Sequence, residues 1–363
     1  MKKILTLLLS LTLVASMFVA CGKKNDAKDT SDAATTAPTT AAATTAPAST
    51  DDKGAAAKTG LAVVSSLANS ANADKEDGLA QTDSTIVAVL VGEDGKILDC
   101  KIDAAQTKIN FSKEGKLVTD AKTVFKSKQE LGTEYGLGAK SGIKKEWNEQ
   151  ADAFAAYVVG KTLDEVKGIA VNEQGVPSDA DLTSSVTIHI GDFVKAIEKA
   201  VANAQDLGAT SADKLGLSVT TDMGQSADAS AKAEGLAQAY SYYSAVTTSA
   251  DGKITSCVID ASQGNVNFDT KGVISTDLKA APQTKQELKE AYGMKAKSSI
   301  GKEWYEEANA FAAYATGKTI DEVKGIAVDE QGVTTDADLT SSVTIHVTPL
   351  ISIVDKAVAN AAK

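Results

Sequence analysis

The alternation of apolar and polar positions predicts a β-hairpin near the start of the folded part of the chain. Residues 85–91 form a β-branched run, residues 93–96 supply a turn, and residues 97–103 alternate between apolar and polar side chains, which is typical of paired strands. One face of the second strand is expected to carry Leu98, Cys100 and Ile102. Residues 109–118, interrupted by Glu114-Gly115, suggest another pair of short strands.

The pattern then changes to a helical period. A helix ending at Gly160 is predicted by the spacing of i, i+4, i+7 and i+11 between Trp147, Ala151, Phe154 and Val158. Residues 162–165 (Thr-Leu-Asp-Glu) fit a capping box that opens a second, short helix. A C-terminal helix is marked by Phe193, Ile197, Ala200 and Val201. Strands followed by helices, without regular βαβ alternation, predict an α+β domain with an antiparallel sheet.

This unit occurs twice in the chain. Residues 78–81 (Gly-Leu-Ala-Gln) recur 157 positions later at 235–238, and residues 161–189 recur at 318–346 with four differences in 29 positions. We therefore expect two tandem homologous domains, repeat 1 at residues 59–211 and repeat 2 at residues 212–363. Each repeat is long enough to bury a core of its own.

The N-terminus has the pattern of a targeting signal. Two lysines precede an uncharged stretch, residues 4–20, which suits a signal-peptide core better than a membrane span. Residues 18–21 (Phe-Val-Ala-Cys) resemble the lipobox of bacterial lipoproteins, which implies a signal peptide over 1–20 and lipidation of Cys21. An ordinary secretory signal is the alternative. Residues 21–58, rich in Ala, Thr and Pro, are expected to form a disordered tether that holds an extracytoplasmic protein at the bacterial cell surface.

Composition excludes several classes of function. The chain of 363 residues has no arginine, and its 37 lysines face 48 acidic residues for a net charge of −11. Such a chain lacks the guanidinium groups that read bases and clamp phosphates, so nucleic-acid binding is not expected. Two histidines and three cysteines do not provide the ligand spacings of metal sites, so no metal is expected.

A cluster of hydroxyls before the last helix of each repeat is the strongest candidate for chemistry. Residues 181–187 read Asp-Leu-Thr-Ser-Ser-Val-Thr, and residues 338–344 repeat them. Hydroxyls at that place are plausible phosphate ligands, because free backbone N–H groups at a helix start favour anions. The alternative interpretation is structural: Ser and Thr act as ordinary caps, and residues 186–188 form a strand.

Residues 181–187 also resemble the C-terminal motif of the FMN-binding domain family, found in flavoprotein subunits of Rnf- and Nqr-type redox pumps and in electron-transfer lipoproteins. That motif is Asp, two variable residues, then Ser/Thr-Gly-Ala-Thr, followed by a helix. Its last Thr can carry FMN through a phosphoester that a secreted flavin transferase installs. The resemblance implies equivalent positions in the first copy at Asp181, Ser184 and Thr187, and in the second copy at Asp338, Ser341 and Thr344.

A second stretch agrees with this resemblance. Residues 133–138 (Thr-Glu-Tyr-Gly-Leu-Gly) resemble the family's Glu-Thr-Pro-Gly-Leu-Gly loop. The resemblance implies that flavin is approached by Gly136, Leu137, Gly138 and, in repeat 2, Gly293. The chain departs from the family where Ser and Val replace the Gly-Ala of the motif, and where repeat 2 lacks the loop's second Gly. These departures leave open a copy that keeps the fold without covalent FMN.

The scarce residues have structural explanations. His189 and His346 follow the candidate threonines by two positions, without the glycine pattern of a nucleophile elbow, so a structural or mildly pH-sensitive role is expected rather than catalysis. Cys100 and Cys257 are one per repeat, which favours buried free thiols over a bridge between repeats. The simplest interpretation of Trp147 and Trp304 is that they anchor their helices in the core. The alternative is that they form a platform for a ring ligand.

Two hypotheses of different classes follow. The first is a lipid-anchored electron carrier with FMN in two domains, redox partners, and no substrate chemistry of its own. The second is a cell-surface binding or structural lipoprotein that keeps the fold without flavin. Both are compatible with the near-identity of the two copies.

Overall fold

Each repeat contains one antiparallel sheet of three long strands. The computed structural model describes residues 54–363. The sheet of repeat 1 has the order β1-β2-β3, and that of repeat 2 has the order β4-β5-β6. The strands are β1 (Ala57–Ser66), β2 (Gly78–Gly92), β3 (Ile97–Phe111), β4 (Lys214–Asp222), β5 (Gly235–Thr248) and β6 (Ile254–Phe268). With their helices, these sheets confirm the predicted α+β class and its two similar units.

The helices follow the strands in each repeat. Repeat 1 has α1 (Lys128–Leu131), the 3₁₀ helix η1 (Gly132–Tyr135), α2 (Trp147–Val158), α3 (Leu163–Lys167), α4 (Ala180–Thr183) and α5 (Gly191–Ala202). Repeat 2 has α6 (Lys285–Leu288), η2 (Lys289–Tyr292), α7 (Trp304–Ala315), α8 (Ile320–Lys324) and α9 (Thr348–Ala361). The three helices expected from the sequence of repeat 1 are confirmed as α2, α3 and α5, and α3 opens with the expected capping box.

The predicted hairpin is present, but its face assignment was wrong at one residue. Leu90 pairs with Asp99 while Val91 pairs with Ile97, so Leu98 lies in a bulge. A bulge reverses the alternation of side chains. Ile97 therefore shares the helix-covered face with Cys100, whereas Leu98 packs on the opposite side of the sheet.

The second predicted pair of strands was also wrong. Residues 109–111 continue β3, which is longer than the alternation alone indicated. Beyond the turn, an isolated bridge joins Phe111 to Leu117, and the backbone N–H of Val118 donates to the Asn110 carbonyl at 2.8 Å. These few bonds do not continue into a second strand, because the chain then runs on toward α1.

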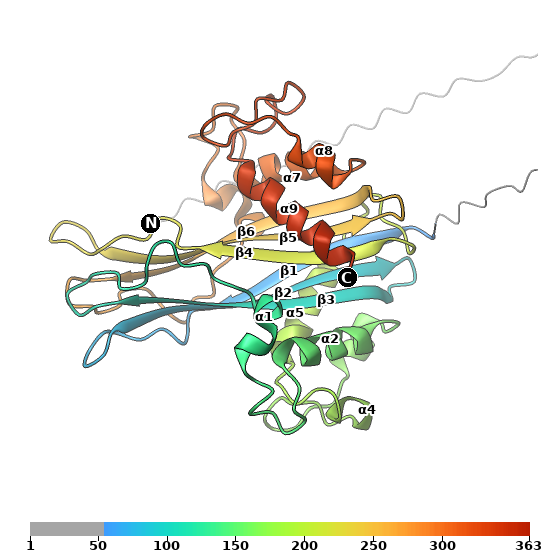
Figure 1. The fold of residues 1–363 in the computed structure, drawn as a ribbon, viewed down its shortest axis with the longest axis horizontal. Helices are drawn as coiled ribbons and strands as arrows, with labels where there is room; N and C mark the ends of the chain where they lie inside the picture. The colour runs from blue at the N-terminus through green and yellow to red at the C-terminus, as the bar shows by residue number, and fades with distance from the viewer. Residues whose placement is uncertain (1–53) are drawn as a thin grey trace, which may run out of the picture. The chain divides into compact units, whose positions relative to one another are not determined.

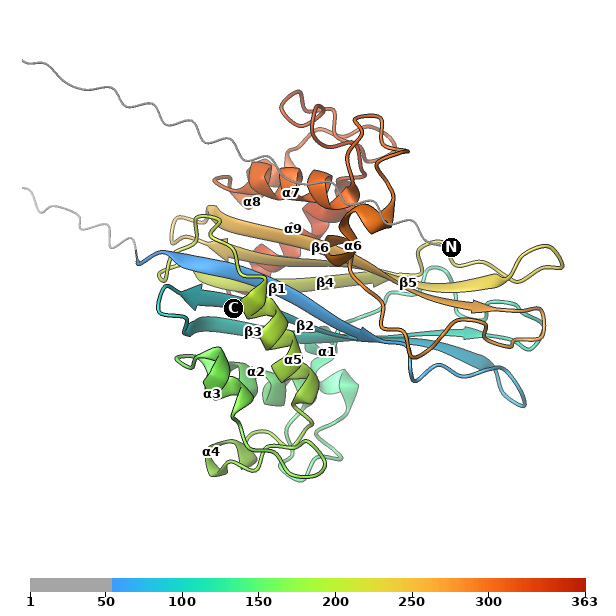
Figure 2. The ribbon, with the colours of Figure 1, turned by 180° about the vertical axis from the view of Figure 1, so that it is seen from behind.

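Both faces of each sheet are buried, which explains the unbroken apolar run in β2. Ile86, Ala88 and Leu90 face the other repeat. The alternate residues Val87, Val89 and Val91 face α2 and α5 of their own repeat. The molecule is thus a four-layer stack in which the two sheets lie between two layers of helices (Figure 1 and Figure 2). Repeat 2 has an equivalent helix-covered core.

The repeats are joined by matched contacts. Residues 54–363 belong to one compact unit, and Phe111 of β3 stacks on Phe268 of β6. An ion pair of 2.6 Å links Lys199 on α5 with Glu287 on α6, and its counterpart of 2.7 Å links Lys356 on α9 with Glu130 on α1. Each residue of one pair is equivalent to a residue of the other, so the two repeats are related by an approximate two-fold arrangement.

The predicted signal peptide, Cys21 and most of the tether lie outside the described residues. The tether was expected to reach residue 58, but Ala57 and Lys58 already belong to β1. Within residues 54–363, no helix combines the length and apolar character needed to cross a bilayer.

Candidate functional site

The first turn of α2 brings together the two segments that the sequence singled out in repeat 1. The backbone N–H of Leu137 donates to Glu146 Oε2 at 2.8 Å. One turn further along the helix, Gln150 Oε1 accepts from the backbone N–H of Thr187 at 2.8 Å and from its hydroxyl at 3.1 Å. The loop with Gly136 to Gly138 and the hydroxyl motif are therefore each bonded to the start of α2, at positions one turn apart.

Repeat 2 has the same arrangement with a carboxylate in place of the amide. Glu303 accepts from the backbone N–H of Met294 at 2.8 Å. Glu307, which is fully buried, accepts from the Thr344 backbone N–H at 2.6 Å and from the Ser298 hydroxyl at 2.9 Å. It also accepts from the Ile345 backbone and the Thr344 hydroxyl, each at 3.0 Å. Gln150 and Glu307 were not predicted as site residues. The signal that could have identified them is their equivalent position in the two copies.

Local sequence explains why the helix starts at this point. Glu146 is the N-cap of α2 in a reciprocal capping box with Glu149, and the same pattern opens α7. The first helical residue, Trp147, is buried and lies edge-on to Phe193 of α5 with ring centroids 5.8 Å apart. The interpretation of the tryptophans as helix-core anchors is confirmed.

A lysine faces the aromatic residues of this site in each repeat. Lys128 Nζ lies 4.7 Å from the centroid of Tyr135 and 5.2 Å from that of Trp147. Lys285 is 2% exposed, and its Nζ lies 4.5 to 4.8 Å from the ring centroids of Tyr240, Tyr292 and Trp304. These lysines were also missed, although both begin a repeated Lys-Gln-Glu-Leu segment.

Burial changes the pKa of the Lys285 ammonium. Removal of the ammonium from water lowers the pKa of Lys285 to about 7, against a smaller opposing effect of Asp260. Its Nζ donates to the Tyr240 hydroxyl at 2.5 Å. The three aromatic faces favour the cationic form and therefore oppose part of this lowering of the pKa.

Two buried carboxyls behind the short helices α1 and α6 are also perturbed. Burial raises the pKa of Asp103 to about 6 and that of Asp260 to about 7. Each carboxylate accepts a backbone N–H at the start of the short helix, from Gln129 and from Gln286, at 3.1 Å. These bonds favour the ionised form, but desolvation outweighs them.

Most of the predicted motif residues are exposed to solvent. The exposed members are Asp181, Ser184, Thr187, Asp338 and Ser341, while Thr344 is half-buried. The backbone N–H groups of Ser185 and Val186 donate to the carbonyl of Leu182 at 2.9 and 2.8 Å. Together with the Thr187 bond to Gln150, these contacts use three backbone donors of the motif within the repeat itself.

The structural alternative for the motif was wrong in both parts. No strand forms over residues 186–188. The side chain of Asp179 caps α4, and α5 has Ile190 at its N-cap without a side-chain bond. Val186 is instead buried in the core, and it anchors the motif between two helices.

The glycines of the candidate loop have separate local causes. Gly136 and Gly293 end the 3₁₀ helices in the left-handed conformation, with φ of 74° and 75°, which glycine adopts without strain. At Gly138 a Cβ would lie 2.8 Å from Glu146 Oε1. Repeat 2 has Lys295 there, whose backbone N–H donates to Glu303 Oε1 at 3.0 Å. The loss of this glycine therefore leaves the loop attached to the helix.

The chemistry of the donor set differs between the repeats when tested for FMN. In repeat 1 Thr187 is an exposed residue whose hydroxyl donates to the neutral amide of Gln150, so a phosphoester at this atom would meet no negative charge from that partner. In repeat 2 the buried carboxylate of Glu307 occupies the donors of Thr344 and would oppose a phosphate. The residues around Thr187 in repeat 1 are therefore compatible with attachment of FMN, although few backbone N–H groups remain to bind its phosphate. The residues around Thr344 in repeat 2 are not compatible with it.

The cysteines and histidines do not join the site chemistry. Cys100 and Cys257 are buried free thiols, as predicted. Burial raises the pKa of both thiols, that of Cys257 to about 12, so they are poor nucleophiles. His189 and His346 are exposed.

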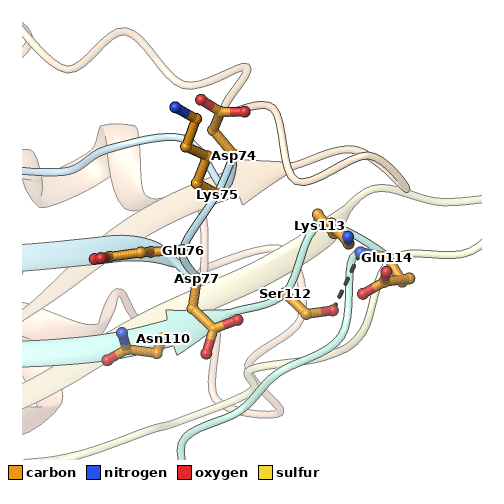
Figure 3. A pocket seen from close by; sticks show the side chains of 8 residues that line it. All are labelled: Asp74, Lys75, Glu76, Asp77, Asn110, Ser112, Lys113 and Glu114. Carbon is orange, nitrogen blue, oxygen red and sulfur yellow. Dashed lines mark hydrogen bonds between the residues drawn. The ribbon is translucent and has the colours of Figure 1, made fainter.

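A cavity of about 520 Å³ lies away from this site, between the β1–β2 connection and the end of β3. It is lined largely by charged side chains, and the carboxylates of Asp74, Glu76 and Asp77 point in different directions (Figure 3). Among residues 54–363, no three His, Cys, Asp or Glu side chains are grouped to hold a metal ion.

Comparison with known proteins gives one short similarity. A chlorophenol reductase from Desulfitobacterium hafniense is 50% identical over 42 residues, which are 12% of this chain and 13% of that protein. No protein-family profile matches the chain. No solved structure matches it.

Proposed function

We propose that this protein is a lipid-anchored, extracytoplasmic carrier of a single flavin, attached to repeat 1 through Thr187. The observation that supports this is the exposed residue Thr187, whose hydroxyl donates to the neutral Gln150 on α2, one turn from the helix position that holds the Gly136–Gly138 loop. Bound flavin would supply the redox chemistry. The chain would supply position and electrostatics.

Repeat 2 would then have a structural role in the carrier. Glu307 holds the motif of repeat 2 closed with four hydrogen bonds from three residues. The repeat still provides half of the buried sheet interface. The proposed anchoring rests on residues 18–21 and the lipobox that they resemble.

The short similarity to a chlorophenol reductase accords with a redox role but does not carry the proposal. The matched segment is 13% of that protein, too little to carry its activity across. The proposal therefore rests on the geometry around Thr187.

A flavin-free binding or structural lipoprotein is the second candidate function. It is favoured by the internal hydrogen bonds of Ser185, Val186 and Thr187, because a phosphate at this place would find these backbone donors already used. The same anchoring and the same fold would serve it.

Intact mass of the full chain, produced together with a flavin transferase, separates the two candidates. A carrier of one flavin gains one FMN residue in mass and the visible absorbance of a flavin. Both are lost in Thr187→Ala and retained in the matched Thr344→Ala. An unmodified, colourless protein without affinity for added FMN would leave the binding protein as the function. Two FMN residues per chain would contradict the restriction to repeat 1.

A further inference from the structure

A second cavity, of about 470 Å³, lies between the repeats and is built from both. Repeat 1 contributes the segment after β3, with Leu117 and Thr119. Repeat 2 contributes the loop at residues 222–226 and two tyrosines of β5, Tyr240 and Tyr242. Its volume is in the range of sites for small molecules, which are commonly lined by aromatic side chains and a few polar groups.

The two tyrosines form a wall that is already ordered. Their ring centroids are 4.8 Å apart with 27° between the planes. Lys285 fixes the ring of Tyr240, because its Nζ donates to the Tyr240 hydroxyl and lies 4.6 Å from the ring centroid. Burial raises the pKa of both phenols, and the nearby Asp222 carboxylate adds to this for each. The wall therefore presents neutral aromatic surface.

The fold does not require rings at these positions. Asp83 and Thr85 occupy the equivalent places in repeat 1. Asp83 accepts hydrogen bonds there from the side chains of Asn69, Gln81 and Gln106 at 2.8 to 3.0 Å. The same strand thus supports a polar network in one copy and an aromatic wall in the other, so the tyrosines are a specific property of repeat 2.

The charge of the cavity selects among ligands. Among the described residues that line it, Asp222 is the one with a formally charged side chain. One of its oxygens accepts from the backbone N–H of Gly224, and a carboxylate has further acceptor positions. Anions are therefore disfavoured, and a ligand with an O–H or N–H donor gains a charge-assisted bond.

We propose that this cavity binds a neutral planar aromatic compound with an O–H or N–H donor, its ring against Tyr242 and its donor toward Asp222. The aromatic contact adds to the burial of the ring. The site involves neither Thr187 nor Thr344, so it does not depend on the attachment of flavin.

Two probes with the same ring system test the proposal: 2-naphthol, which is neutral with one donor, and 2-naphthoate, which is an anion. Titration calorimetry of the full chain is expected to give saturable binding of one 2-naphthol and at least tenfold weaker binding of 2-naphthoate. Tyr242→Ala is expected to lower the affinity for 2-naphthol at least tenfold. The matched Thr85→Ala in repeat 1, and Thr187→Ala, are expected to leave it unchanged.

Two further variants separate loss of the ligand contact from loss of the fold. Tyr242→Phe keeps the ring and is expected to retain binding. Asp222→Asn is expected to weaken the binding of 2-naphthol and to reduce the ratio of its affinity to that of 2-naphthoate. The proposal is overturned by absence of saturable 2-naphthol binding to the wild type, by equal affinity for 2-naphthoate, or by undiminished binding in a Tyr242→Ala variant with wild-type circular dichroism.

Discussion

Phe111 and Phe268, which occupy the same position in the two repeats, stack with ring centroids 4.2 Å apart and ring planes 7° apart. Both rings are fully buried. Gly78 and Gly235 make room for them, since a Cβ at either glycine would lie 2.3 Å from the facing ring. One position of the duplicated sequence therefore supplies both halves of a contact between the repeats.

Truncation of this stack should destabilise the whole folded unit. Phe111→Ala is expected to lower the free energy of unfolding by about 3 to 5 kcal/mol, because it removes a buried ring and leaves a cavity. Equilibrium urea unfolding measures the change. Phe111→Leu should cost less, and Val124→Ala, at an 82% exposed position, should leave stability unchanged. Equal stability of Phe111→Ala and wild type would show that the stack does not hold the repeats.

The repeats themselves suggest the matched substitution for the motif in repeat 2. Glu307→Gln copies the arrangement of repeat 1, where Gln150 accepts from Thr187 and donates to the carbonyl of Lys145. It is expected to cost less than about 1 kcal/mol, whereas Glu307→Ala, which leaves buried donors unpaired, should cost roughly 2 to 4 kcal/mol. Thermal unfolding of both variants checks this. A large loss in Glu307→Gln would mean that the negative charge itself is required.

Asp103 and Asp260 should make the protein more stable in mild acid. Burial raises their pKa from 3.8 to about 6 and about 7, so the folded state binds more protons than the unfolded state between these values. Their contribution to stability is complete below about pH 4 and is lost as the pH rises to about 7. Asp260→Asn should remove the part of this decline that comes from Asp260, on the order of 4 kcal/mol for a pKa raised from 3.8 to about 7. Urea unfolding across this range would contradict the assignment if wild type and variant kept the same slope.

Lys285 should act in the opposite direction at higher pH. Burial lowers its pKa from 10.5 to about 7, so the unfolded state binds more protons between these values. Stability from this group is complete above about pH 10 and is lost as the pH falls through about 7. Lys285→Met, which fills the aromatic surroundings without a charge, should remove the rise. The half-buried equivalent in repeat 1, Lys128→Met, serves as the control, and an unchanged alkaline slope in Lys285→Met would rule out this assignment.

The two ion pairs between repeats should contribute modestly and equally. A double-mutant cycle of Lys199→Met and Glu287→Gln is expected to give a coupling of about 0.5 to 1 kcal/mol that falls with salt, since both side chains are about 30% exposed. The equivalent cycle at Lys356 and Glu130 repeats the measurement within one molecule. A coupling near zero in both cycles would assign the interface to apolar contact alone.

Much of each repeat could be predicted because its signals are local. The period of Trp147, Phe154 and Val158 reports the buried face of α2, and the Thr162 capping box satisfies donors within one turn. The failures have equally specific causes. A one-residue bulge moved Leu98 to the other face, and Val186 joined the core of repeat 1 in a segment that forms no strand.

The duplication can be read directly from the sequence, and the α+β class, the main helices and the hairpin follow from the spacing of residues near one another in the chain. Contacts between residues far apart in the chain depend on tertiary packing. It paired Gln150 with Thr187 and Glu307 with Thr344, enclosed Lys285 among three aromatic rings, and placed the Tyr240–Tyr242 wall against a loop of the other repeat. These contacts arise where sheets and helices pack, and packing is set by burial of whole faces rather than by local periodicity.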